Sequence, residues 1–155
     1  MSIEVNNESG FEVDGAEFAA LARHVLDALN VHPLTELSIL LVDATVMAEL
    51  HVQWMDEPGP TDVLSFPMDE LTPGTAERPA PEGLLGDVVI CPSVASKQAA
   101  ESGHSAVEEM LLLTCHSILH LLGYDHAEEE ERRVMFDLQR RLLLTFLASR
   151  PEQQA

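Results

Sequence analysis

The sequence predicts a single α/β (α+β) domain in which a small mixed four-stranded sheet packs with about five helices. Three observations indicate this fold class. The chain has 155 residues, which fits one domain at 1–150 followed by a disordered tail at 151–155. Hydrophobic residues make up 46% of the chain, enough for a buried core. Short strand-like segments also alternate with longer segments whose apolar residues have helical spacing.

The first part of the chain predicts a strand, a helix and a second strand. Apolar residues alternate with polar neighbours over Ile3–Val5, as in a short strand. A helix is expected from Asp14 or Gly15 to a point before Pro33, because the apolar residues recur at helical spacing. The apolar run at Glu36–Val42 predicts a buried strand.

The middle of the chain predicts a helix, two strands and a long loop. Asp43 is expected to cap a helix that runs to about Trp54. A strand follows at Asp62–Phe66, where a proline stops it. Residues 68–83 are rich in proline and lack apolar periodicity, which predicts a mobile loop inside the domain. The fourth strand is expected at Leu84–Ile90.

Three helices are expected to complete the chain. A proline at its first position favours a helix at Pro92–Ala100. The next helix is expected to begin after Ser105, which can form a capping box with Glu108, and to run to Leu122. A glycine then ends that helix, and a last helix is expected at about Glu128–Ala148.

Charge and cysteine content limit the function classes. The 27 acidic and 8 basic side chains give a net charge of −19, so bulk attraction cannot hold a polyanion, and any nucleic-acid function needs a local metal or arginine cluster. The two cysteines, Cys91 and Cys115, indicate no disulfide framework. The chain has neither a signal-peptide pattern nor an apolar run of about 18 residues. We therefore expect a soluble, cytoplasmic protein with no membrane partner.

Three histidines carry the chemistry that the sequence predicts. His116 and His120 lie four residues apart in the penultimate helix, so their imidazoles differ by about 40° around the helix axis and project from one face. His126 could not reach the same ion if the helix continued. Gly123 removes this obstacle, because it can adopt the left-handed conformation that ends helices. We therefore expect all three histidines to bind one metal ion.

The ligand set predicts the kind of metal site. Three neutral imidazoles suit Zn²⁺ and leave a fourth position for water, as in catalytic zinc sites, although nickel, copper or another divalent ion would accept the same ligands. The spacing equals that of the metzincin proteases, but Ser117 stands where those enzymes have a glutamate base. Met135 falls in the last predicted helix, so no Met-turn is evident. Peptide hydrolysis is therefore disfavoured.

The block HSILHLLGYDH at His116–His126 resembles the signature of the YbeY family of bacterial rRNA maturation factors and metal-dependent endoribonucleases. Two further blocks agree in order and spacing, GPTDVLSFP at Gly59–Pro67 and LGDVVI at Leu85–Ile90. The resemblance covers nearly the whole chain apart from the termini and the loop at 69–83.

This resemblance implies an α/β domain with a small sheet and a three-histidine zinc site. It also implies cleavage of single-stranded RNA during maturation of the small-subunit rRNA 3′ end, and a role in ribosome quality control with the small ribosomal subunit or its proteins as partners. Two positions differ from the family pattern. Ser117 replaces a usual glycine, and Met55 replaces an arginine that commonly precedes the Pro-Thr-Asp block, which removes an expected phosphate contact.

Several polar residues near these blocks are candidates to orient a ligand histidine or hold a water molecule. Asp62 and Asp87 lie near strand ends, and Asp125 adjoins the third histidine. Each of these aspartates could alternatively serve only as a backbone cap in a turn. Ser117 is a further candidate, as a hydrogen-bond donor near the metal.

Most of the basic residues fall on or just past the last predicted helix, namely Arg132, Arg133, Arg140, Arg141 and Arg150. They could form a local footprint for RNA phosphates. We favour the alternative, a solvated face on which these arginines pair with Glu128–Glu131 and Asp137.

The sequence as a whole predicts a zinc-dependent endoribonuclease in which His116, His120 and His126 act through the metal. The attacking group is either water or the RNA 2′-hydroxyl. Two alternatives stay open. One is a metal hydrolase acting on another substrate, and the other is a non-catalytic ribosome assembly factor with a structural metal. The acidic charge and Met55 favour the assembly factor, because an acidic surface suits basic ribosomal proteins.

Overall fold

The computed structural model describes residues 2–149 and contains one mixed sheet. Its strands are β1 (Ser2–Asn7), β2 (Glu36–Leu41), β3 (Val63–Pro67) and β4 (Leu84–Ile90), in the order β1-β2-β4-β3. Strand β2 pairs in parallel with β1 and with β4, and β3 runs antiparallel to β4. The predicted mixed four-stranded sheet is therefore confirmed.

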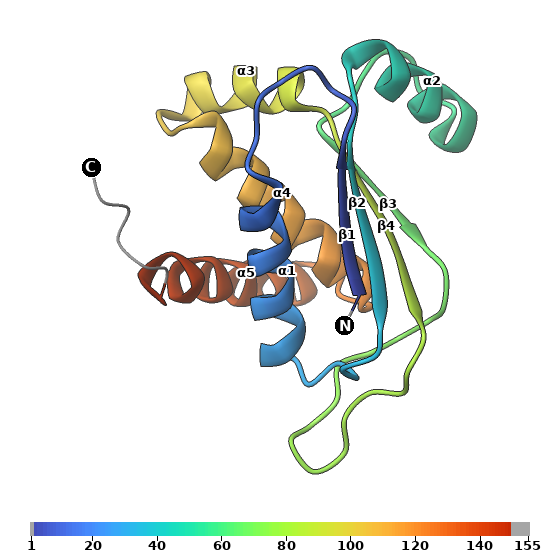
Figure 1. Cartoon of the computed structure of the whole chain (residues 1–155), viewed down its shortest axis with the longest axis vertical. Coiled ribbons are helices and arrows are strands. Elements are labelled where there is room, and N and C mark those ends of the chain that lie inside the picture. Colours follow the sequence, from blue (N-terminus) through green and yellow to red (C-terminus); the bar gives the residue numbers. More distant parts are fainter. Residues whose placement is uncertain (1, 150–155) are drawn as a thin grey trace.

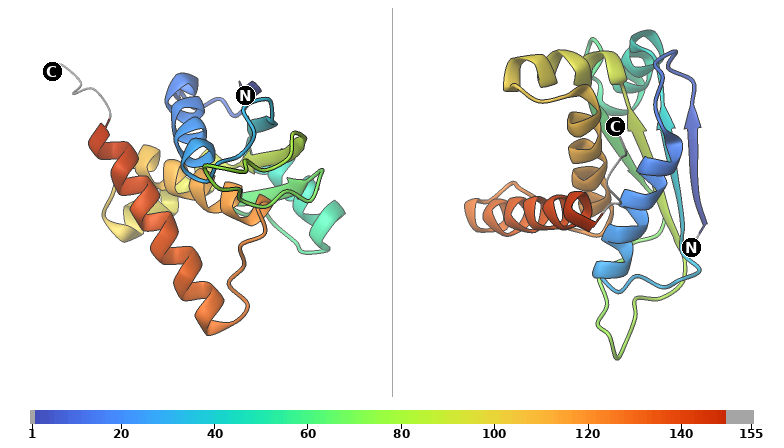
Figure 2. Two further views of the ribbon diagram at one scale, coloured as in Figure 1. Left: turned by 90° about the horizontal axis from the view of Figure 1, so that it is seen from below. Right: turned by 60° about the vertical axis from the view of Figure 1, so that its left-hand side comes forward.

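Five helices pack around this sheet within the described residues. They are α1 (Gly15–Ala28), α2 (Ala44–Met55), α3 (Pro92–Ser102), α4 (Ala106–Leu121) and α5 (Glu129–Ser149). Helices α1 and α4 lie on one side of the sheet, and α2 lies on the other side near one end of the strands (Figure 1). Helix α5 packs against α4 and extends away from the sheet (Figure 2).

The core occupies both faces of the sheet. The larger apolar cluster fills the space between the sheet and helices α1, α4 and α5, and its fully buried members include Phe18, Leu21, Ile39, Leu85 and Ile118. A smaller cluster lies on the α2 side and consists of Val42, Met47, Leu64, Val89 and Cys91. Helix α4 is buried on most of its circumference, which fixes its direction against β3, β4 and α5.

The helix starts show the caps that the sequence predicts at Asp43 and Ser105, and Asp14 caps α1 in the same way. The Asp14 carboxylate accepts a hydrogen bond from the Ala16 amide at 3.1 Å, and the Asp43 carboxylate accepts one from the Val46 amide at 2.9 Å. At the start of α4, Ser105 and Glu108 form both halves of a capping box. These side chains satisfy amide groups that the first helical turn leaves without partners, as expected.

Several element ends differ from the predictions by one or two residues. The first strand is longer than Ile3–Val5, and α3 continues past Ala100 until Gly103, whose φ of +80° ends it. Pro67 was expected to stop the third strand but is its last residue, paired with Gly86. The sheet tolerates this proline because β3 is an edge strand.

The predicted loop at 68–83 contains no helix or strand, in agreement with the sequence, and connects β3 to β4 at one end of the molecule (Figure 1). It is tied to the end of α1 by two backbone hydrogen bonds. The Gly74 amide donates to the Leu29 carbonyl at 3.0 Å, and the Ala80 amide donates to the Asn30 carbonyl at 2.9 Å. Leu71 and Ala80 are buried, so this segment also contributes to the core.

The sequence also makes predictions about the C-terminal tail and the two cysteines. The tail predicted at 151–155, together with Arg150, lies outside the described residues. Cys91 and Cys115 are both buried free thiols, which agrees with the absence of a disulfide framework. No helix within residues 2–149 has the length and apolar character needed to cross a membrane.

Candidate metal centre

Three histidines converge at the C-terminal end of α4. The ring centroids of His116 and His120 are 4.7 Å apart, those of His120 and His126 are 4.9 Å apart, and those of His116 and His126 are 5.4 Å apart. One nitrogen from each ring lies within 4.8 Å of the other two. Bonds from Zn²⁺ to tetrahedral nitrogen ligands place the nitrogens roughly 3.4 Å apart, so small side-chain rotations suffice to place all three on one ion. The donor set therefore fits a divalent metal.

The turn after α4 brings the third histidine back toward the first two. The Gly123 amide donates to the His120 carbonyl at 3.0 Å, and the Tyr124 amide donates to the Leu119 carbonyl at 3.0 Å. This pair of bonds is a Schellman motif, and Gly123 occupies its left-handed position with a φ of +97°. The glycine break that the sequence predicts is therefore confirmed.

Helix α5 orients the first histidine. The Nδ1–H group of His116 donates a hydrogen bond to the side-chain oxygen of Gln139 at 2.7 Å. Gln139 is buried, so water does not compete for this bond. Because Nδ1 holds the proton, the lone pair of Nε2 is free for a metal ion, as is usual for metal-ligating histidines.

The surroundings favour neutral imidazoles. Burial lowers the pKa of His116 and outweighs the opposing effects of Gln139 and of the Asp62 charge. The pKa of His120 is also lowered, first by burial and then by the neighbouring histidines. Both rings are therefore neutral at pH 7, the form that binds metal.

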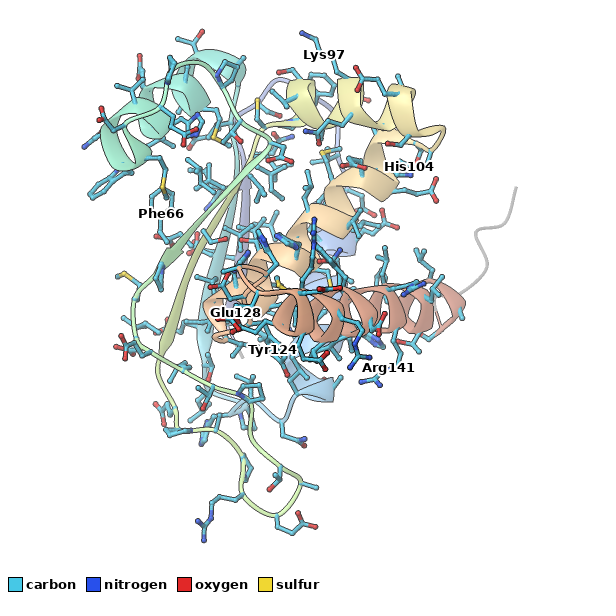
Figure 3. All side chains as sticks on the ribbon, turned by 180° about the vertical axis from the view of Figure 1, so that it is seen from behind. Phe66, Lys97, His104, Tyr124, Glu128 and Arg141 are labelled. Atoms are coloured by element: carbon cyan, nitrogen blue, oxygen red, sulfur yellow. The ribbon has the colours of Figure 1, made fainter. Side chains whose placement is uncertain are left out.

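A cavity of about 380 Å³ opens beside the histidines. Its walls come from β3, α4 and α5, and its lining residues are Asp62, Val63, Ser65, Leu112, Leu113, His116, His120, Phe136 and Gln139. Figure 3 shows α5 passing across α4, with Tyr124 and Glu128 in the connection that leads into α5. The histidines thus lie where three elements meet around a space large enough for a small ligand.

Two of the aspartates predicted near the metal lie close to the histidines. Asp62 lines the cavity, and its carboxylate accepts hydrogen bonds from the Val63 amide at 2.7 Å and the Thr61 hydroxyl at 3.3 Å. The Asp125 carboxylate accepts a hydrogen bond from the His126 amide at 2.7 Å. Both side chains therefore hold local backbone at the edge of the histidine cluster.

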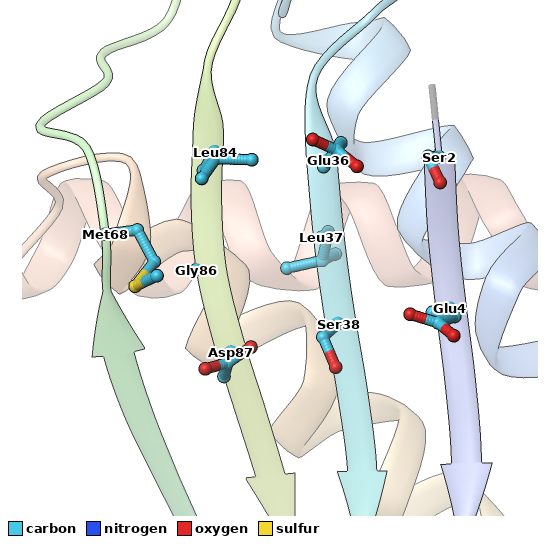
Figure 4. A pocket seen from close by; sticks show the side chains of 9 residues that line it. All are labelled: Ser2, Glu4, Glu36, Leu37, Ser38, Met68, Leu84, Gly86 and Asp87. Atoms are coloured by element: carbon cyan, nitrogen blue, oxygen red, sulfur yellow. The ribbon is translucent and has the colours of Figure 1, made fainter.

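The other two candidates are placed differently. Ser117 is fully buried, and its hydroxyl hydrogen-bonds to that of Ser65 on β3, which links α4 to the sheet next to the cavity. Asp87 lies on the opposite sheet face, beside Ser38 and Met68, with the helices behind the strands (Figure 4). The structure therefore does not bring Asp87 to the histidines.

Two aromatic side chains, Trp54 and Phe66, lie away from the histidine cluster. Trp54 and Phe66 pack edge to face, with centroids 5.9 Å apart, and both line a groove on the face of the sheet away from α4.

Burial raises the pKa of the Cys115 thiol to about 12, and this residue is not in the histidine cluster. Met135 is fully buried in the core, as the sequence predicts, and Met55 is an exposed residue at the end of α2.

The arginines of α5 form two groups. Arg133 pairs with Glu130 and Asp137, and Arg140 pairs with Asp137 at 2.8 Å, which confirms the solvated face expected for these residues. Arg132 and Arg141 make no ion pair among residues 2–149, contrary to that expectation. Arg132 places its guanidinium carbon 5.8 Å from the centroid of the Phe136 ring. Sequence reasoning missed Phe136 and Gln139, because their role depends on how α5 crosses α4.

Comparison with known proteins identifies the family. The family description "Endoribonuclease YbeY" matches residues 3–147. A protein of that name from Beutenbergia cavernae is 69% identical over 150 residues, which covers 97% of this chain and 100% of that protein. Another from Clavibacter sepedonicus is 64% identical and covers 96% of this chain and 97% of that protein. This chain belongs to the endoribonuclease YbeY family.

Membership in the YbeY family confirms the resemblance and places the chain among RNA-cleaving hydrolases. A solution structure of a Thermotoga maritima protein has the same fold, with a TM-score of 0.66 and 24% sequence identity. The match covers 98% of this chain and 99% of that one. The histidine cluster is thus a candidate metal centre of a metal-dependent YbeY enzyme.

Proposed function

We propose that this chain is a zinc-dependent, single-strand-specific endoribonuclease that matures the 3′ end of small-subunit rRNA and takes part in ribosome quality control. The observation that carries the proposal is the cluster of three imidazoles beside a cavity, in a chain that matches proteins named endoribonuclease YbeY over nearly its whole length. We assign the activity to one domain at residues 1–150. The enzyme acts in the cytoplasm on the small ribosomal subunit.

His116, His120 and His126 would hold the ion. When bound, a divalent ion supplies Lewis acidity, which polarises a phosphoryl oxygen and lowers the pKa of water. The chain's own residues prepare the site for this chemistry. Gln139 fixes the proton of His116 on Nδ1, and burial keeps His116 and His120 neutral. The attacking group is water or the 2′-hydroxyl of the RNA.

The shape of the site supports an unpaired RNA strand as substrate. The histidines that line the cavity are partly buried, so a phosphodiester must enter the cavity to reach them. A flexible single strand can present its backbone in this way, whereas a duplex presents a stiffer and wider surface. Asp62 at the cavity wall repels phosphate, so a bound cation is needed to hold the backbone there.

Metal content and RNA cleavage test the proposal together. Protein purified without chelator is expected to contain about one zinc ion per chain, measured by elemental analysis, and to cut an unstructured RNA. The double variant His116→Ala, His120→Ala should lose both properties. His32→Ala removes a histidine outside the cluster and should keep both. Undiminished cleavage by the double variant would reveal a contaminating nuclease and overturn the assignment.

One observation favours a second candidate function. The net charge of −19 suits a basic protein partner better than free RNA. The second candidate, which runs against the family's RNA-cleaving activity, is therefore a non-catalytic assembly factor of the small subunit whose metal is structural. Tight binding to small-subunit particles without metal-dependent cleavage of free or particle-bound RNA would support this candidate. Metal-dependent cleavage of either RNA supports the endoribonuclease.

A further inference from the structure

We propose that Arg132 binds a phosphate of the RNA strand at the rim of the histidine cavity, and that Phe136 holds the Arg132 guanidinium in place. The proposal rests on the proposed RNA-cleaving function of this cavity. The guanidinium carbon lies 5.8 Å from the centroid of the Phe136 ring, within the range of a cation–π interaction. Phe136 itself lines the cavity.

The spacing along α5 places Arg132 on the face that meets the cavity. Phe136 follows Arg132 by four residues and Gln139 follows it by seven, so the three side chains project within about 60° of one another. Phe136 and Gln139 both line the cavity. Arg132 therefore extends the same face by one helical turn, and it is exposed to solvent at that position.

The Phe136 ring connects this guanidinium to the histidine cluster. It lies nearly parallel to the ring of His116, at 5.8 Å and 18°, and to the ring of His126, at 5.9 Å and 17°. The Arg132 guanidinium and two of the three histidines are thus in contact with one aromatic side chain. An RNA backbone that places one phosphate at the histidines has a neighbouring phosphate within reach of this rim.

Charge favours a phosphate as the ligand of Arg132. No lysine or arginine lines the cavity, and the chain carries a net charge of −19, so a polyanion needs a cation close by. Within residues 2–149, no ion pair or side-chain hydrogen bond engages the Arg132 guanidinium, whereas Arg133 and Arg140 pair with carboxylates. An unpaired guanidinium presents a planar set of donors that fits phosphate.

Cleavage kinetics of a fluorogenic single-stranded RNA test the proposal with zinc-supplemented protein. Arg132→Ala is expected to raise KM about tenfold, because the variant loses one charged hydrogen-bonding contact with the RNA. Its kcat should change less than about twofold, because the lost contact is equally present in substrate and transition state. The dependence of log KM on log salt concentration should weaken by about 0.7, the value for one phosphate on a single strand.

Arg141 offers a matched control on the same helix. Like Arg132, it makes no ion pair among the described residues, but it lies nine residues further along α5. That separation is about 13 Å along the axis and about 180° around it, so Arg141 faces away from the cavity. Figure 3 shows Arg141 well beyond Glu128, the residue that precedes α5. Arg141→Ala should leave KM and its salt dependence unchanged.

A phosphodiester chain of abasic units, used as a competitive inhibitor, separates phosphate binding from base stacking. Arg132→Ala should raise its inhibition constant by the same factor as the KM for RNA. Phe136→Leu keeps an apolar side chain but removes the ring, so it should also raise both constants. It should add nothing in the Arg132→Ala background, because Phe136 acts through Arg132. A Phe136→Leu effect on RNA but not on the abasic chain would overturn the positioning role.

Two further results distinguish failure of the Arg132 proposal from failure of the proposed function. If the wild type cleaves RNA but Arg132→Ala keeps its KM and salt dependence, or Arg141→Ala matches Arg132→Ala, the proposal for Arg132 is wrong while the proposed function stands. If the zinc-supplemented wild type neither binds nor cleaves RNA, both proposals are wrong. Thermal unfolding of each variant checks that the chain still folds.

Discussion

The side chain of Gln139 is the structural partner of the first candidate ligand. It accepts the Nδ1 proton of His116 at 2.7 Å from a buried position on α5. Without this acceptor, the His116 ring could rotate, and the proton could move to the nitrogen that the metal requires. The packing of α5 on α4 therefore determines how well the histidine cluster is preorganised.

Replacing Gln139 tests this orienting role. Gln139→Leu keeps a side chain of similar size but removes the acceptor, so zinc affinity should fall about 10- to 100-fold. The measurement is a competition titration with a chromophoric chelator. Gln139→Glu keeps an oxygen acceptor and should retain affinity at or above that of the wild type. Equal affinity of the leucine variant and the wild type would show that Gln139 does not orient the ring.

We expect that Gly123 is required because of its left-handed backbone conformation and not because a larger side chain would clash. Its φ is +97°, yet an added Cβ would meet nothing nearer than a Thr72 methyl group at 4.0 Å. Gly123→Ala should therefore destabilise the fold by about 1–2 kcal/mol in denaturant unfolding and weaken zinc binding as His126 shifts. Gly123→Asn should lose less stability, because asparagine adopts left-handed backbone more readily. An alanine variant with wild-type stability and affinity would refute the argument.

The convergence of the three histidines is predictable from the sequence because they lie within one short segment. Helical periodicity relates His116 to His120, and a glycine explains His126, so no long-range contact is needed. Gln139 and Phe136 could not be found in the same way, because their positions depend on the crossing of α4 and α5. The prediction that Asp87 lies near the histidines is wrong for a related reason. Its position in a strand is predictable, but the sheet face that meets the histidines is not.

The capping box at the start of α4 shows how local sequence stabilises a helix end. Ser105→Ala removes the side-chain half of the capping box and should cost about 1 kcal/mol in the free energy of unfolding. Zinc affinity should be unchanged, because the histidines lie at the other end of the helix. Ser105→Asp, which keeps an acceptor, serves as the control. A large loss of zinc affinity in the alanine variant would mean that this cap also shapes the metal site.

The same cap predicts a pH dependence. The backbone amide of Ser105, followed by its hydroxyl, lowers the pKa of Glu108 below its ordinary value of 4.5. The charged carboxylate thus stabilises the fold above that value, and this contribution is lost as the pH falls through the lowered pKa. Glu108→Gln should therefore be less stable than the wild type at pH 7, and the gap should narrow below about pH 4. Urea unfolding at both pH values measures it, and a constant gap would contradict the prediction.

At the level of elements, local patterns predict helices and strands more reliably than the connections between them. The caps predicted at Asp43 and Ser105 both appear in the structure, because capping involves residues only three positions apart. The loop at 68–83 is different. Its proline content predicts irregular backbone, but its anchoring to the end of α1 depends on tertiary packing.

For the whole molecule, metal binding should couple to stability. The site joins the end of α4 to the segment before α5, so zinc should bind the folded chain in preference to the unfolded one. Free zinc at about 100 times its dissociation constant should add about 2.7 kcal/mol, which corresponds to a rise in Tm of roughly 5–10 °C. Calorimetry with zinc and with a chelator measures the difference. His126→Ala should abolish the rise, and a rise that persists in this variant would place the ion elsewhere.

The overall architecture was predictable to the level of strand and helix content. Composition and periodicity predict one domain with a small sheet and five helices, and the family resemblance implies the same arrangement. The strand order and the assignment of α2 to the opposite face follow from long-range packing that no local pattern records.

The three candidate ligands come from one short stretch of chain, whereas the facing wall of the cavity comes from α5 and β3. The three candidate ion ligands and the exposed residues of α5 proposed to contact the substrate are therefore encoded in separate parts of the gene, while Gln139 on α5 still orients one ligand. If Arg132 contacts RNA as proposed, a change on the exposed turn of α5 would alter RNA binding without changing any of the three candidate ligands. Selection would thus have a route to a new RNA preference that leaves the ion ligands of the enzyme in place.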